Sequence, residues 1–176
     1  NKGGYPMGVV VSDGKIVWNS PYGVGYYLIG FDNNDILKIL SLNGLSTTDV
    51  EKLVADEGIR DAVTFQEEAS DANNHFVKLI VNGEKRESNG LGSGANPRTA
   101  IGQRKDGTVL LLVTDGRGSN GHLGATASDL IEVMESYGAV NAANIDGGSS
   151  STMYYKDEYL MTSVTLYYSN SSWQIG

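Results

Sequence analysis

The chain has 176 residues, 40% of them hydrophobic, which is enough to bury the core of a single domain over residues 1–176. Its formal net charge of −8 and pI of about 4.6 argue against a nucleic-acid partner, which would require a basic patch to neutralise phosphates. The absence of cysteine excludes disulfides, thiolate zinc sites and a cysteine nucleophile, and no apolar run reaches the ~18 residues of a membrane-spanning helix, so no integral membrane segment is expected.

The first third of the chain predicts β-hairpins followed by a short helix. Each hairpin joins two short apolar runs across a pair of turn residues. The runs are residues 8–12 with 15–19 and 25–31 with 35–41, and the turns are Asp13-Gly14 and Asn33-Asn34. Thr48 and Glu51 then have the spacing of a helix capping box, and Gly58 is placed to end that helix.

The rest of the chain predicts further strands and a second helix. Residues 98–104 and 108–114 form a hairpin, and the run Val-Leu-Leu-Leu-Val in its second strand is typical of a strand buried on both faces. Thr126 and Asp129 have cap spacing for a helix over 127–137. The remaining predicted strands are residues 75–81, residues 139–145, and residues 153–155, the last pairing through a turn at 156–158 with the residues after that turn.

Hairpin-connected strands with a pair of helices indicate an α+β fold. We expect a largely antiparallel β-sheet built from hairpins, with two main helices packed on it. The sequence shows no repeat, linker or low-complexity tract.

Polar clusters stand at three predicted strand ends. They are Pro97-Arg98-Thr99, Asp115-Gly116-Arg117 and Asp146-Gly147-Gly148-Ser149. The first begins a strand whose hairpin partner ends at the second, so Arg98 and Asp115 should lie near the same end of the sheet. The helix over 127–137 returns the chain, so the third cluster can join them. Glycine backbone N–H groups can hold an oxyanion, and arginine presents a fork that matches phosphate or carboxylate.

Each cluster taken alone also has an ordinary structural interpretation. Asp-Gly after a strand is usually a turn, the arginines could form surface ion pairs, and the hydroxyls of residues 149–152 could be a solvated edge. A triad of Ser149, His122 and Asp115 is conceivable, but no nucleophile-elbow motif is present. The aspartates lack EF-hand spacing and no histidine pair suggests zinc, so neither a metal nor a cofactor is predicted.

Read together, these motifs resemble the phosphodiester glycosidase family. The resemblance runs through residues 1–6, 8–14, 79–83, 97–102, 115–117 and 144–150. The family has an Asn-Gly-Gly-aromatic segment where this chain has Asn1-Lys2-Gly3-Gly4-Tyr5, and Lys2 interrupts it. Further strands precede that segment in the family, so part of the family's sheet is expected to be missing from this chain. His122 inherits no role, because the family's pattern is lenient in that loop.

The resemblance implies a hydrolase that cleaves the glycosidic bond of a sugar-1-phosphodiester, such as a GlcNAc-1-phosphodiester. The phosphate monoester that leaves has a second pKa of about 6, so its charge must be held rather than protonated. A carboxylate must then attack the anomeric carbon or activate water. The implied phosphate ligands are Arg98 and Arg117, completed by Gly147, Gly148, Ser149 and Ser150, with Thr99 orienting Arg98 or the ligand. Asp115 and Asp146 are the candidates for base or nucleophile, in either order, or for holding sugar hydroxyls.

Bacterial members of the family are often exopolysaccharide-related and extracytoplasmic, which implies a polysaccharide or surface-glycan partner outside the cytoplasm. A non-catalytic module that binds carbohydrate or phosphoglycan is the alternative function, since a fold can keep a pocket without turnover. An unrelated serine hydrolase is a third hypothesis.

Overall fold

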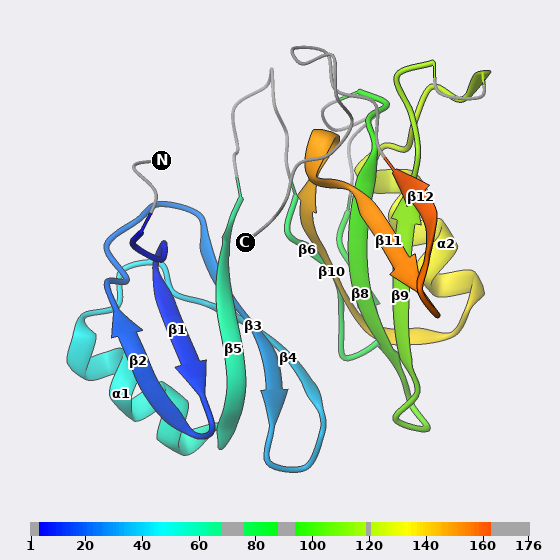
Figure 1. Ribbon diagram of the computed structural model, residues 1–176. Helices are drawn as coiled ribbons and strands as arrows, with labels where there is room; N and C mark the ends of the chain where they lie inside the picture. Colours follow the sequence, from blue (N-terminus) through cyan, green and yellow to red (C-terminus); the bar gives the residue numbers. More distant parts are fainter. Residues whose placement is uncertain (1–3, 68–75, 88–93, 119–120, 163–176) are drawn as a thin grey trace.

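The computed structural model describes residues 4–67, 76–87, 94–118 and 121–162 (Figure 1). These residues form a pair of 5-stranded antiparallel sheets, a separate 2-stranded hairpin and the helices α1 and α2. Within them, no helix has the length and apolar character needed to cross a bilayer. The predicted α+β class, with antiparallel strands and two main helices, is confirmed, and the strands divide between sheets instead of forming a single one.

The first sheet has the strand order β2-β1-β5-β3-β4. Its strands are β1 Val9–Ser12, β2 Lys15–Asn19, β3 Tyr26–Asp32, β4 Leu37–Ser41 and β5 Ile59–Gln66. Both predicted hairpins are present. Asp13 and Gly14 have φ values of 54° and 71°, as expected for a tight turn whose twist matches the strands it joins. Helix α1, Thr47–Asp56, buries Val50 and Val54 against one face of this sheet.

Helix α1 begins earlier than its predicted cap. The N-cap is Ser46, whose hydroxyl accepts a hydrogen bond from the Asp49 amide while the Asp49 carboxylate accepts one from the Ser46 amide. Thr48 and Glu51, predicted as the capping box, lie inside the helix. The two pairs share the same three-residue spacing, and the extended backbone of Ser46 decides between them. Gly58, with φ of 60°, follows the helix end as predicted.

The second sheet has the order β7-β6-β10-β8-β9. Its strands are β6 Lys78–Val81, β7 Glu84–Lys85, β8 Arg98–Arg104, β9 Val109–Thr114 and β10 Ala139–Gly147. Helix α2, Ala127–Ser136, packs on its outer face through Leu130 and Met134. The predicted Thr126–Asp129 cap is confirmed. The strand predicted over 75–81 starts at Lys78, and residue 75 lies outside the described residues.

Strand β9 is not buried on both faces, contrary to the prediction. Leu110 and Leu112 pack against the α2 cluster, but Val109 and Leu111 are 43% and 69% exposed. The reason is its position, since β9 is the outermost strand of its sheet and α2 covers only one of its faces. The last hairpin, β11 Thr152–Tyr155 with β12 Glu158–Thr162, forms as predicted.

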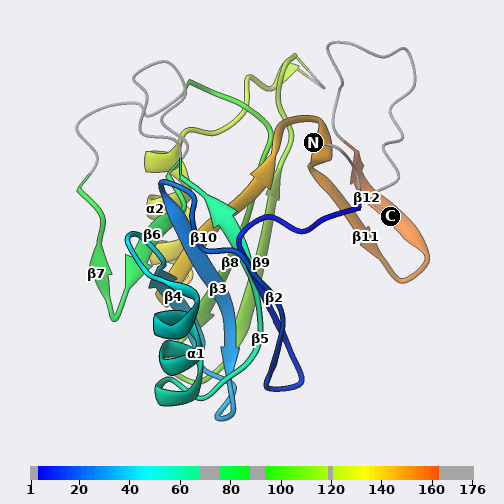
Figure 2. The same ribbon diagram turned by 90° about the vertical axis from the view of Figure 1, so that its left-hand side faces the viewer.

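The sheets pack face to face, with α1 and α2 on the two outer sides (Figures 1 and 2). An apolar cluster fills the space between them; it includes Ile29, Leu37 and Ile39 from the first sheet and Ala143 from the second. The buried Gln103 of β8 also reaches across, because its Oε1 accepts a hydrogen bond from the Leu37 amide at 2.8 Å. The second sheet therefore packs against α2 on one face and, away from its edge strand β9, against the first sheet on the other.

Candidate functional site

The register of the second sheet brings the three polar clusters together. Arg98, at the start of β8, pairs with Thr114 on one side and with Gly147 on the other. Asp115 follows Thr114 directly. The Gly148 amide donates to the Pro97 carbonyl at 2.7 Å, so the backbone at 97–98 is flanked by the other two clusters. Hairpin geometry predicted the proximity of Arg98 and Asp115, and the return of the chain through the helix over 127–137 allowed the third cluster to join them.

The glycines of these clusters allow close backbone contact. A Cβ atom at Gly116 would lie 2.9 Å from the Pro97 nitrogen, so a larger residue there would push the second cluster away from the first. Gly148 has φ of 62°, and a Cβ atom at that position would lie 3.0 Å from Nη2 of Arg117. The Arg117 guanidinium is therefore held directly against the glycine loop that ends β10. This places a positive charge beside the backbone of the third cluster.

Arg98 is only 4% exposed, and its guanidinium holds two neighbouring loops. Nε donates to the Ala125 carbonyl at 2.6 Å, just before α2, and Nη2 donates to the Gly94 carbonyl at 3.1 Å. Burial lowers the pKa of Arg98, and the Asp129 carboxylate acts in the opposite direction. The Arg98 side chain thus brings positive charge to the site, and two of its nitrogen atoms also hydrogen-bond to main-chain carbonyls.

Asp115 forms a close pair with His122, a residue that the family resemblance left without a role. Nδ1 of His122 lies 2.7 Å from Oδ2 of Asp115, with the imidazole 63% and the carboxylate 23% exposed. The loop returns on itself because the Arg117 amide donates to the Leu123 carbonyl and the Gly118 amide to that of His122. The glycines at 118, 121 and 124, all with positive φ, were the available signal for this return.

Asp146 and Thr99 meet at the end of β10. The Thr99 hydroxyl donates to the Asp146 carbonyl, and the Asp146 carboxylate accepts a hydrogen bond from the Gly147 amide at 2.8 Å. Asp146 is exposed. Ser149 and Ser150 lie in the short 3-10 turn Gly148–Ser150 and are half-buried. Thr99 is thus placed to support the strand end that carries Asp146.

Two further polar side chains at this strand end were missed by sequence reasoning. Asn144 and Ser151 are both fully buried, and within the described residues neither Oδ1 of Asn144 nor Oγ of Ser151 has a hydrogen-bond partner. Buried polar atoms normally have partners, so such atoms mark places where a ligand or water can bind. The signal available in the sequence for Asn144 was that asparagines interrupt the apolar run of residues 139–145. No three acidic or histidine side chains of the described residues gather as metal ligands would.

Comparison with known proteins identifies the family. The family model for phosphodiester glycosidases matches residues 1–175. The chain belongs to the phosphodiester glycosidase family. This confirms the resemblance drawn from the motifs.

This chain is similar to parts of two larger proteins. The catalytic domain of zebrafish N-acetylglucosamine-1-phosphodiester alpha-N-acetylglucosaminidase, solved in a form auto-inhibited by its pro-peptide, has the same fold with a TM-score of 0.62. It is 22% identical, and the match covers 89% of this chain and 50% of that one. The uncharacterised Bacillus subtilis protein YomE, derived from the SPbeta prophage, is 42% identical over 65 residues, 37% of this chain and 10% of YomE. The chain thus spans only half of the zebrafish structure and a small part of YomE.

Proposed function

We propose that this chain hydrolyses the bond between the anomeric carbon of a sugar and a phosphodiester. Membership of the phosphodiester glycosidase family supports the reaction class. The observation that carries the proposal is the meeting of the three clusters, with the Arg117 guanidinium against Gly148. Positive charge, backbone amides and two carboxylates are the groups that this reaction requires.

The chemistry divides between charge stabilisation and attack. When the bond from C1 to the phosphate oxygen breaks, its electron pair stays on the phosphate, which leaves as a monoester without needing a proton. Arg117 and the buried Arg98 supply positive charge that stabilises the leaving phosphate, assisted by Gly147, Gly148 and the hydroxyls of Ser149 and Ser150.

The second half of the reaction belongs to the carboxylates. Asp146 is exposed beside the glycine loop and is positioned to attack C1 or to take a proton from the water that does so. Asp115 orients His122 through their 2.7 Å contact, and this pair can accept or return a proton. Thr99 positions Asp146 through its hydrogen bond to the Asp146 carbonyl.

We infer that the substrate carries GlcNAc-1-phosphate, because the name of the zebrafish relative specifies that group. The family resemblance also leads us to propose a surface glycan or exopolysaccharide outside the cytoplasm as its source. Fractionation of the native host, followed by immunoblotting, tests this location. Recovery only in the cytoplasm would contradict it.

Release of GlcNAc from UDP-GlcNAc tests the activity. We expect turnover by the unaltered chain and a loss of at least about 100-fold in Arg117→Met, because removing one group that stabilises charge in the transition state typically costs that much. Arg104→Met is the matched control, since Arg104 is an exposed arginine at the far end of β8. Binding of UDP-GlcNAc without any release would favour a non-catalytic binding module. An equal loss of GlcNAc release in both variants would contradict the role proposed for Arg117.

The Asp115–His122 contact also fits a serine hydrolase, in which an aspartate orients a histidine that activates Ser149. Ser149→Ala separates the two mechanisms. It should abolish hydrolysis of p-nitrophenyl acetate if Ser149 is the nucleophile. It should lower sugar release only modestly if Ser149 contributes one phosphate contact among several.

A further inference from the structure

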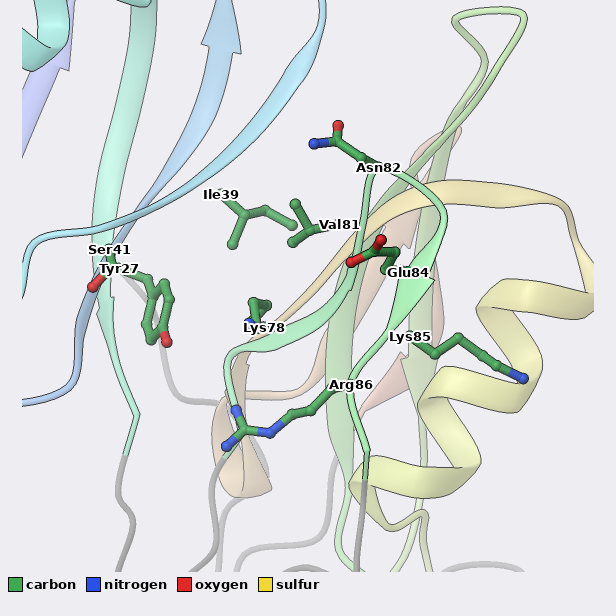
Figure 3. Close-up of a pocket in the computed structure, with 9 residues that line it drawn as sticks. All are labelled: Tyr27, Ile39, Ser41, Lys78, Val81, Asn82, Glu84, Lys85 and Arg86. Carbon is green, nitrogen blue, oxygen red and sulfur yellow. The ribbon is translucent and has the colours of Figure 1, made fainter.

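A cavity of about 450 Å³ opens between the sheets, away from the candidate site (Figure 3). Its walls come from β3 and β4 on one side and from β6, β7 and the residues next to them on the other. The volume falls within the ~300–1,000 Å³ of typical small-molecule sites. None of the residues assigned to the glycosidase reaction lines it. We call this cavity the inter-sheet cleft.

Lys78 supplies a positive charge to the inter-sheet cleft. It is half-buried on β6, and within the described residues its ammonium group has no hydrogen bond or ion pair. An anion bound beside this ammonium group would gain a charge-assisted contact. The chain as a whole carries a net charge of −8, so this positive charge is a local feature.

Arg86 lines the same cavity and is held rigidly. Its Nη1 lies 2.6 Å from Oε2 of Glu67, and its guanidinium carbon lies 4.0 Å from the centre of the Phe76 ring. Glu67 also accepts a hydrogen bond from the Val77 amide at 3.0 Å, which fixes the carboxylate. The other N–H groups of the Arg86 guanidinium make no hydrogen bond within the described part of the chain. Arg86 therefore keeps donors for a ligand, although Glu67 balances its charge.

Lys85 has the same charge as Lys78 but a different orientation. Its ammonium lies 3.0 Å from the Glu135 carboxylate on α2 and points away from the cleft (Figure 3). Only its aliphatic stem can contribute to the lining. Lys78 is therefore the cation of the lining that has no ion pair among the described residues, and the carboxylate of Glu84 lines the same cavity. Lys85 provides a natural control.

Tyr27 gives the inter-sheet cleft an aromatic wall with a polar tip. Figure 3 shows its ring and hydroxyl directed toward the same space as the Lys78 and Arg86 side chains. Burial, reinforced by the Glu67 carboxylate, raises the pKa of Tyr27, so the phenol is neutral at physiological pH and can donate a hydrogen bond. The hydroxyl of Ser41 and the amide of Asn82 add polar groups at the rim.

We propose that the inter-sheet cleft binds a sugar unit that carries a carboxylate or phosphate group. Lys78 contacts the anion, Arg86 donates to it or to a neighbouring hydroxyl, and the Tyr27 ring packs on the apolar face of the sugar. This second site is independent of the proposed hydrolysis. It would hold another unit of an anionic glycan.

Isothermal titration calorimetry with four small ligands tests the proposal. They are glucuronate, GlcNAc 6-phosphate, neutral GlcNAc and inorganic phosphate. We expect at least one anionic sugar to bind more tightly than both GlcNAc and inorganic phosphate, and the comparison of glucuronate with the sugar phosphate identifies the anion. Failure of both anionic sugars to bind would overturn the proposal. So would equal binding of GlcNAc or of inorganic phosphate.

Charge-removing variants then locate the binding. Lys78→Met should lower the affinity for the preferred anionic sugar by about tenfold or more, because a charge-assisted contact is lost. Lys85→Met should leave the affinity within about twofold. An unchanged affinity in Lys78→Met, or equal losses in both variants, would refute the assignment. Should Lys78→Met fail to fold by circular dichroism, Lys78→Gln gives the same comparison. Release of GlcNAc from UDP-GlcNAc should be unaffected in Lys78→Met, so failure here is distinguishable from failure of the proposed hydrolase activity.

Discussion

Asp146 is exposed, and within the described residues its carboxylate accepts one hydrogen bond, from the Gly147 amide. Asparagine at this position can still accept that bond through its side-chain oxygen. Asp146→Asn should therefore change the free energy of unfolding by no more than about 0.5 kcal/mol, as is usual for surface substitutions. Turnover should fall by about 100-fold or more, because the amide is neither a base nor a nucleophile. Urea unfolding and GlcNAc release measure the two effects, and a variant that stays fully active would disprove the role.

Arg98 should behave differently, because its side chain also holds the fold. Lysine cannot donate to the Ala125 and Gly94 carbonyls in the geometry of the guanidinium fork. Arg98→Lys should therefore lower the free energy of unfolding by about 1–3 kcal/mol as well as reducing turnover. Arg104→Lys, at an exposed position on the same strand, should be neutral in urea unfolding. Equal stability of the two lysine variants would mean that the Arg98 contacts contribute little.

The turn between β3 and β4 depends on Asp32, which is 5% exposed. Its Oδ1 accepts hydrogen bonds from the Asn34 and Ile36 amides at 2.8 and 2.9 Å, and the Lys38 ammonium lies 3.7 Å from Oδ2. Burial alone would raise the pKa of this carboxyl, but these amides and Lys38 outweigh it and lower the pKa.

A lowered folded-state pKa means that the charged carboxylate stabilises the fold above the unfolded pKa of about 3.9, and that this contribution is lost as the pH falls through the folded pKa. Asp32→Asn should therefore be less stable than the unaltered chain by about 1–2 kcal/mol near neutral pH. This difference in the free energy of unfolding should shrink as the pH falls below the usual pKa of aspartate. Urea unfolding at a series of pH values measures it, and a gap that is constant with pH would contradict the electrostatic origin.

At the scale of helices and strands, the sequence predicted the features that depend on neighbouring residues, such as turns. Asp13-Gly14 specifies its hairpin because the tight turn requires positive φ. The start of α1 was misplaced because Ser46 and Thr48 each have an acidic residue three positions later. The exposure of β9 could not be read from its apolar run, because it depends on which strand occupies the edge of the sheet.

The candidate site shows the same division between local and long-range information. Hairpin register was enough to predict that Arg98 and Asp115 lie near each other. The burial of Arg98 was not predictable, because it depends on where the chain enters α2. The contact of His122 with Asp115 was considered only as part of a conceivable serine triad, because a loop that folds back through glycines carries no hydrophobic periodicity that would fix its path.

At the scale of the whole molecule, β10 links the two places where we propose binding. Lys78 of the inter-sheet cleft pairs with Ala143, four residues before Gly147 on β10. With a rise of about 3.3 Å per residue, the two positions lie roughly 13 Å apart along the strand. A glycan of several units could span that separation. Relative motion of the sheets would reshape the cleft, because its walls come from both of them.

Gln103 makes polar contacts between the sheets, as Glu67 does with Arg86 and the Val77 amide. Gln103 is 2% exposed; its Oε1 accepts from the Leu37 amide at 2.8 Å, and its Nε2 donates to the Asp35 carbonyl at 2.6 Å. Leucine has a similar size but can hydrogen-bond to neither the Leu37 amide nor the Asp35 carbonyl, and a buried backbone group left without a partner costs about 1–3 kcal/mol.

Gln103→Leu should therefore lower the free energy of unfolding by about 2–4 kcal/mol. Gln66→Leu is the control, because Gln66 makes one exposed hydrogen bond, to the Val24 carbonyl, and should cost less than about 1 kcal/mol. Urea unfolding followed by circular dichroism compares the two, and equal losses would show that the Gln103 hydrogen bonds contribute little to the contact between the sheets.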